Sequence, residues 1–147
     1  MPSCRIWVRT GQVSALAGAV ALLAAGCAGA SEQDTKAACQ QMKQTAEERV
    51  RTTLSAAVQR DAQAVQSGQL TLENTQKALG DIGGQFRDAA AKADPEVSAP
   101  ANQVADQFEA LKGSIQKGQT PDLEAMQSSL RDALQKLGRA CEPYLNQ

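Results

Sequence analysis

The chain has 147 residues, of which 42% are hydrophobic, 3% aromatic and 21% charged, and it contains no histidine. Its length allows one modest domain. The 15 lysines and arginines balance 16 aspartates and glutamates, for a formal net charge of −1, and this argues against a nucleic-acid partner, whose binding depends on clustered cations. Without histidine the chain lacks the commonest general base and zinc ligand, which excludes most hydrolase and metalloenzyme mechanisms.

The first thirty residues have the features of an export signal. Residues 1–10 carry Arg5 and Arg9 and no acidic residue, and an apolar run follows over residues 13–25. This run is shorter than the roughly 20 residues that a transmembrane helix needs. A basic start followed by a short apolar run is typical of a secretory signal peptide, so we expect the mature protein outside the cytoplasm.

The end of the apolar run, Leu22-Leu23-Ala24-Ala25-Gly26-Cys27, resembles the lipobox of bacterial lipoproteins, although alanine stands three residues before the cysteine where leucine is usual. The resemblance implies that Cys27 becomes the N-terminus and carries a diacylglycerol on its sulfur. Two or three acyl chains would then anchor the protein stably to the lipid bilayer at the outer face of the cell membrane. In the alternative, signal peptidase cleaves after Ala28-Gly29-Ala30 and releases a soluble, secreted protein.

The sequence divides into a signal peptide (1–26), a lipid-anchored tether (27–35) and a helical domain (36–147). From Lys36 onward the chain is rich in alanine, glutamine, leucine, lysine and glutamate and poor in β-branched and aromatic residues. It shows no sustained alternation of apolar and polar residues, so strands are not expected. The domain is therefore predicted to be all-α.

Apolar spacing and capping signals predict four helices. They extend from about Asp34 to Ser67, from after Thr71 to Asp94-Pro95, from Pro100 to Gly118, and from about Pro121 to Pro143. Ser31 and Asp34 provide a start signal for the first helix. Gly80, Gly83 and Gly84 lie inside the second and predict a bend or a break near Asp81, because glycine weakens a helix. Short connections between the helices predict an antiparallel up-down bundle.

The two halves of the domain resemble each other. Val65-Gln66-Ser67-Gly68-Gln69 matches Ile115-Gln116-Lys117-Gly118-Gln119 at an offset of 50 residues, and Leu72-Glu73 matches Leu123-Glu124 at an offset of 51. We interpret this as a duplicated αα-hairpin. Convergence is the alternative, because antiparallel helix pairs share glycine turns and capping residues.

Cys39 and Cys141 are the two cysteines that remain once Cys4 is removed with the signal peptide and Cys27 is assigned to the lipid anchor. In an extracytoplasmic chain such a pair predicts one disulfide. In a four-helix up-down bundle, the start of the first helix and the end of the fourth lie at the same end. An odd number of helices would separate the two cysteines by roughly 30 Å, beyond the reach of a disulfide. The disulfide and the four-helix topology therefore support each other.

The sequence offers no recognisable catalytic, metal or cofactor site. No glycine-rich phosphate loop follows a strand, and no Glu-x-x-His pair could build a di-iron centre. Glu47 and Glu48 are adjacent, hence about 100° apart around a helix, and we interpret them as surface charges. We therefore predict no enzymatic activity, no metal and no cofactor.

Two functions are compatible with these features. The first is a non-enzymatic cell-envelope lipoprotein with an interaction or structural role, which would bind an envelope protein through an exposed apolar or polar-rimmed helix face. The alternative is a carrier or sensor of a small ligand, a lipid or a peptide, held between the hairpins. Such a ligand is expected in a cavity lined by Ile82, Phe86, Val104 and Phe108, which lie on the apolar faces of the second and third helices.

Overall fold

A computed structural model describes residues 29–69, 71–119 and 121–146, all of which belong to helices or to their connections. The predicted signal peptide and Cys27 lie outside the described residues. The elements in chain order are α1 (Glu32–Gln44), the π-helix η1 (Thr45–Leu54), α2 (Ser55–Gln66), α3 (Glu73–Ala90), α4 (Pro95–Gln116) and α5 (Leu123–Leu145). Because α1, η1 and α2 are continuous, they count as one helical run, and the predicted four-helix antiparallel bundle is confirmed. None of the helices described is long and apolar enough to span a membrane.

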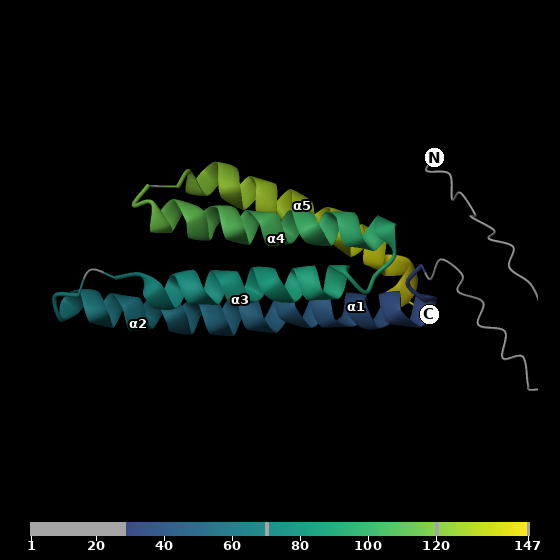
Figure 1. Ribbon diagram of the computed structural model, residues 1–147, viewed down its shortest axis with the longest axis horizontal. Helices are drawn as coiled ribbons and strands as arrows, with labels where there is room; N and C mark the ends of the chain where they lie inside the picture. The colour runs from purple at the N-terminus through teal and green to yellow at the C-terminus, as the bar shows by residue number, and fades with distance from the viewer. Residues whose placement is uncertain (1–28, 70, 120, 147) are drawn as a thin grey trace, which may run out of the picture.

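The helices form two layers, seen edge-on in Figure 1. One layer pairs the run α1–η1–α2 with α3, and the other pairs α4 with α5. The main contact between the layers is α3 against α4. Within the described residues the α5 backbone approaches only α4 and the first helix, α1. The first helical run and α5 therefore meet at the end of the bundle that holds the start of α1 and the end of α5, which we call the closed end. They separate toward the other end, which we call the open end.

Helix α1 begins with the predicted capping box. The Ser31 hydroxyl accepts a hydrogen bond from the Asp34 backbone N–H at 3.1 Å, and the Asp34 carboxylate accepts from the Ser31 backbone N–H at 3.3 Å. These bonds satisfy N–H groups that a helix start leaves unpaired. The helix thus starts at Glu32, and Thr35, which we assigned to the tether, is buried in the bundle. The helical domain therefore begins before the predicted boundary at residue 36.

The π-helical segment η1 was not predicted. The sequence carried a signal for it, because Met42, Ala46, Val50, Leu54 and Val58 follow one another at steps of four. In an α-helix each step of four rotates the side chain by about 40° around the axis, so such a run drifts off one face. The wider i→i+5 turn of a π-helix counters this drift. The π segment therefore keeps the apolar side chains of the first helical run on a common side.

One glycine of α3, Gly83, allows this helix to lie close to α4. Helix α3 is continuous from Glu73 to Ala90, so the break expected near Asp81 is wrong. A Cβ at Gly83 would lie only 3.4 Å from the Ala105 carbonyl oxygen and 3.4 Å from the Phe108 Cβ. The missing side chain lets the two helices approach, and the buried packing that results offsets the weak helix propensity of glycine.

Two prolines lie inside helices, contrary to prediction. Helix α4 begins at Pro95, five residues before the predicted start, and it includes Pro100. Val97 and Ala101, on either side of Pro100, are completely buried, and this packing outweighs the hydrogen bond that the proline cannot donate. Helix α5 likewise continues past Pro143 to Leu145, because its last turn packs against the core through Tyr144 and Leu145.

The two hairpin turns at the open end of the bundle have the same geometry. Gly68 and Gly118 adopt positive φ angles of 87° and 64°, as glycine does after a helix. The N–H groups of Gln69 and Gln119 donate to carbonyl groups five residues earlier, at 2.9 and 3.0 Å, which completes a Schellman motif in both turns. The likeness of the two sequence segments therefore extends to their hydrogen bonding.

The helices that follow these turns are capped differently. Helix α5 is capped locally by Asp122, whose carboxylate accepts from the Ala125 N–H at 3.0 Å. Helix α3 has no cap of its own. Instead Asp61 from α2 accepts hydrogen bonds from the backbone N–H groups of Asn74 at 3.2 Å and Thr75 at 2.7 Å. This buried carboxylate joins the two helices of the first hairpin.

Candidate functional site

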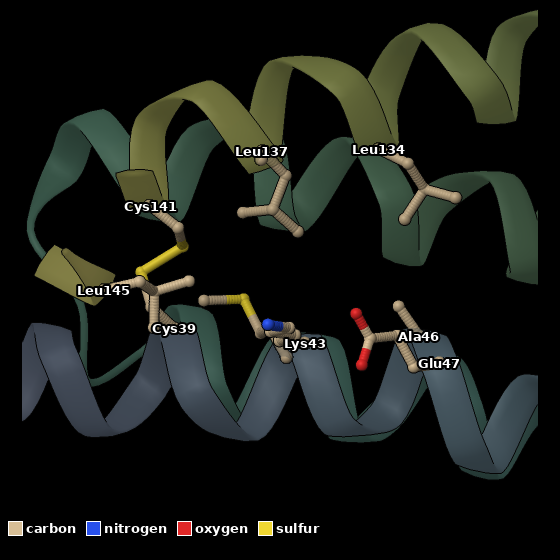
Figure 2. A pocket seen from close by; sticks show the side chains of 10 residues that line it. Cys39, Lys43, Ala46, Glu47, Leu134, Leu137, Cys141 and Leu145 are labelled. Atoms are coloured by element: carbon tan, nitrogen blue, oxygen red, sulfur yellow. A yellow bond between two sulfur atoms is a disulfide. The ribbon is translucent and has the colours of Figure 1, made fainter. Parts of the chain in front are cut away.

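The closed end of the bundle is held by the predicted disulfide. Cys39 of α1 and Cys141 of α5 are joined with an S–S distance of 2.07 Å and a Cα–Cα distance of 5.5 Å. Both cysteines are almost completely buried. Figure 2 shows the bond crossing directly from α1 to α5. The predicted pairing is confirmed, and it fixes the two ends of the domain to each other.

A polar network supports the same end. The Tyr144 hydroxyl of α5 donates to the Asp94 carboxylate at 3.0 Å, and the Asp94 backbone N–H donates to the Thr35 hydroxyl of α1 at 3.0 Å. Its hydrogen bond to Asp94, together with desolvation and nearby negative charge, raises the pKa of Tyr144 above its usual value. The network therefore connects α1, the start of α4 and α5 while Tyr144 is protonated.

An apolar hollow opens beside the disulfide where α5 begins to separate from the first helical run. Its volume is about 360 Å³. One wall comes from α1 and η1 and the other from α5, as Figure 2 shows, and the lining residues are Cys39, Met42, Lys43, Ala46, Glu47, Leu134, Leu137, Gly138, Cys141 and Leu145. Gly138 contributes space, since a Cβ built there would meet no atom within 4 Å. The hollow is thus a preformed concave site with walls from the first and last helices.

A second, polar hollow of about 350 Å³ adjoins the first. The two share Lys43, Glu47 and Leu145. The second is otherwise lined by polar residues of α1 and η1, namely Gln40, Gln44 and Glu48. Together the two hollows form one amphipathic depression, apolar at the disulfide and charged on its outer side.

An apolar stripe leads from the hollow toward the open end of the bundle. We call Ala46, Val50, Leu54, Val58 and Val65 the η1–α2 stripe. Its first three residues are half-buried, whereas the Val58 and Val65 side chains are 49% and 44% exposed. Exposure increases along the stripe because α5, which covers Cys39 and Met42, no longer approaches η1 and α2. Among the described residues, α5 does not cover the distal half of the stripe, and Val58 and Val65 remain about half exposed there.

The residues predicted to line a ligand cavity belong to the packed core. Ile82, Phe86 and Val104 are completely buried, and the rings of Phe86 and Phe108 stack with centroids 6.1 Å apart. None of the four lines the hollow beside the disulfide. Phe108 alone reaches a smaller hollow of about 200 Å³ between α4 and α5. The hollow beside the disulfide also lies between the two hairpins, with one wall from α1 and η1 and the other from α5, but its lining differs from the predicted residues. A ligand between the hairpins stays a prediction.

Met42, Leu134, Leu137 and Gly138 line the hollow although sequence reasoning did not single them out. Met42, Leu134 and Leu137 are apolar residues inside the predicted first and fourth helices, where apolar residues are typical of a core. The signal that could have identified them is Gly138, a glycine inside the apolar stripe of a helix next to a predicted disulfide. Such a glycine leaves a space that a larger side chain would fill.

Within the part of the chain that the structure describes, no group of three or more acidic or cysteine side chains could hold a metal ion. No buried side-chain polar atom in this part lacks a hydrogen-bond partner. The predicted lipid attachment point, Cys27, lies outside the described residues. Comparison of the chain with protein-family models, with curated proteins and with solved structures gave no match.

Proposed function

We propose that the protein is a non-enzymatic, extracytoplasmic interaction protein, anchored to the membrane through a lipid on Cys27, which binds another envelope component through its η1–α2 stripe. The observation that carries the proposal is the exposure of Val58 and Val65 on a stripe whose proximal part is covered. An exposed apolar face on a helix is typical of a surface that receives a partner helix. The disulfide supports an oxidising, extracytoplasmic compartment.

The short tether gives the proposed orientation. Only Ala28 to Ser31 separate Cys27 from the first residue of α1, so the anchor would lie within roughly 20 Å of the helix start. The disulfide end would then face the bilayer, and the turns at Gly68 and Gly118 would point away from it. In this orientation the exposed part of the stripe is accessible to other proteins of the envelope.

The lipid anchor is tested by the intact mass of the protein extracted from membranes, with and without reduction. We expect a chain that begins at Cys27 and carries the mass of two or three acyl chains, and reduction should add two hydrogen atoms. The matched control is Cys27→Ser, which should move the protein from the membrane fraction to the soluble fraction. A chain that begins at Ser31 without added lipid would refute the anchor.

The interaction surface is tested by photocrosslinking in intact cells. A photoreactive amino acid at Val58 is expected to give a reproducible crosslinked product of defined mass, because this exposed position lies on the stripe. Arg60 is the matched control, since it is exposed on the same helix and lies about 200° around the axis from Val58. Equal crosslinking from both positions, or none from Val58, would argue against the stripe as the binding surface.

The alternative function, a carrier of a small ligand, is supported by the hollow beside the disulfide. Its volume of about 360 Å³ lies within the range of ligand sites, which extends from about 300 to 1,000 Å³. Its lining is mainly apolar with two charged residues, as in sites that orient an amphipathic ligand. This site is separate from the exposed part of the stripe, so the two functions can be tested independently.

A further inference from the structure

We infer that the amphipathic depression at the closed end binds a single-chain zwitterionic amphiphile of the lysophospholipid class. The inference deepens the carrier function proposed above, and the membrane-proximal position of the site rests on the proposed anchor. It is carried by the direct contact of an apolar and a charged hollow, which share Lys43, Glu47 and Leu145.

The apolar hollow suits one aliphatic chain. The half-buried Ala46 and Leu134 line it from two helices above the almost completely buried Met42 and Leu137, and Gly138 leaves the space between the helices open. The volume of about 360 Å³ is near the lower limit for ligand sites, which favours one chain over two. A chain in this hollow would also cover the buried disulfide at its inner end.

The charged hollow suits a zwitterionic head group. It holds one cation, Lys43, and two carboxylates, Glu47 and Glu48, together with the amides of Gln40 and Gln44. Among the described residues neither Lys43 nor Glu47 takes part in an ion pair. Lys43 can therefore bind a phosphate, while the glutamates can bind an ammonium group of the same head. An anionic head alone would leave the carboxylates facing a like charge.

The position of the site in the chain favours a ligand from the bilayer. The hollow begins at Cys39, seven residues into α1, which corresponds to roughly 10 Å along the helix axis. With the short tether from Cys27, the opening lies close to the level of the lipid head groups. A lipid with one chain can leave a bilayer more readily than one with two, because it buries less apolar surface there.

The proposal is tested by photolabelling the mature protein reconstituted in phosphatidylcholine vesicles. The probe is lysophosphatidylethanolamine with a diazirine in its acyl chain. In the wild type we expect adducts concentrated on the peptides that contain Met42, Leu134 and Leu137. In Gly138→Leu the new side chain enters open space and fills the hollow, so these adducts should fall by about tenfold or more. Binding weakens about tenfold when only about two methylene groups of the ligand are no longer buried.

Gly113→Leu is the matched control. Gly113 also lies inside a helix and a Cβ there would meet nothing within 4 Å, but it lines neither hollow. Both leucine variants replace a helix glycine by a better helix former, so both are expected to fold. Labelling of Gly113→Leu should equal that of the wild type. Undiminished labelling of Gly138→Leu, or adducts spread over the outward faces of the helices, would overturn the proposal.

The head group is tested by competition. Unlabelled lysophosphatidylethanolamine should displace the probe at lower concentration than anionic lysophosphatidylglycerol or a fatty acid, and Glu47→Gln should reduce this preference. Equal competition by the three lipids would overturn the zwitterionic assignment. The anchor is judged separately by the mass of the mature chain, so site-specific labelling of a chain without lipid would refute the anchor and support the ligand site.

Discussion

Replacement of both Cys39 and Cys141 by alanine is expected to lower the free energy of unfolding by about 4 to 5 kcal/mol. The disulfide joins residues 102 positions apart, and a crosslink that closes so long a loop removes much of the conformational entropy of the unfolded chain. This loss is a large part of the stability expected for one small domain. Urea or guanidinium unfolding of the wild type and the double variant, with linear extrapolation to water, measures it.

The reduced wild type is the control for this substitution. Reduction breaks the crosslink and keeps both sulfur atoms in the core, so any additional loss in the double variant reports packing around Cys39 and Cys141. We expect the two unfolding curves to lie close together, because the alanines remove only a small volume. If reduction lowers the free energy of unfolding by less than about 1 kcal/mol, the disulfide does not make the expected contribution to stability.

The effect is expected to be concentrated at the closed end. There α5 approaches α1, and over the rest of its length it depends on α4. Loss of the disulfide should therefore loosen α5 from α1 while the α3–α4 contact persists, and amide hydrogen exchange should rise most near the start of α1 and the end of α5. Since these two elements form the walls of the hollow, the disulfide supports the candidate site as well as the fold.

Local signals predicted the course of the chain well. The capping box at Ser31, the glycines at Gly68 and Gly118 and the two cysteines each act through few neighbours, so their effects can be derived from short stretches of sequence. The two prolines inside helices were predicted wrongly, because their cost is outweighed by burial of side chains that become neighbours only in the folded bundle. The π segment lies between these cases, since its steps of four were visible but were interpreted as α-helical.

The candidate site was less predictable, because it arises from the divergence of two helices. Ile82, Phe86, Val104 and Phe108 have the apolar spacing of a core, and they form the core. The residues of the η1–α2 stripe have the same spacing, and the sequence does not reveal that α5 leaves Val58 and Val65 uncovered. Amphipathic patterning predicts which face of a helix is apolar. The crossing angle between two helices determines over which length that face is covered by the other helix.

Replacement of Asp61 by alanine is expected to lower the free energy of unfolding by about 2 to 3 kcal/mol. The carboxylate is 1% exposed and accepts hydrogen bonds from the N–H groups of Asn74 and Thr75 and from the Asn74 amide. Its removal leaves the start of α3 without a cap and a buried N–H without a partner. Asp122→Ala is the matched control, because it removes an exposed cap and the Ala125 N–H can then donate to water. It should lower the free energy of unfolding by less than Asp61→Ala.

The contribution of Asp61 is also expected to depend on pH. Desolvation raises the pKa of Asp61, but the hydrogen bonds from Thr75 and Asn74 outweigh it, so the pKa in the folded protein lies below its ordinary value. A carboxyl with a lowered pKa stabilises the fold above the unfolded-state pKa of about 4, and this stabilisation is lost as the pH falls through the lower folded value. The difference in unfolding free energy between the wild type and Asp61→Asn, which cannot ionise, should therefore be constant near neutral pH and shrink as the pH falls from about 5 to about 3. A difference that stays constant or grows over this range would show that the ionised carboxylate is not the form that caps α3.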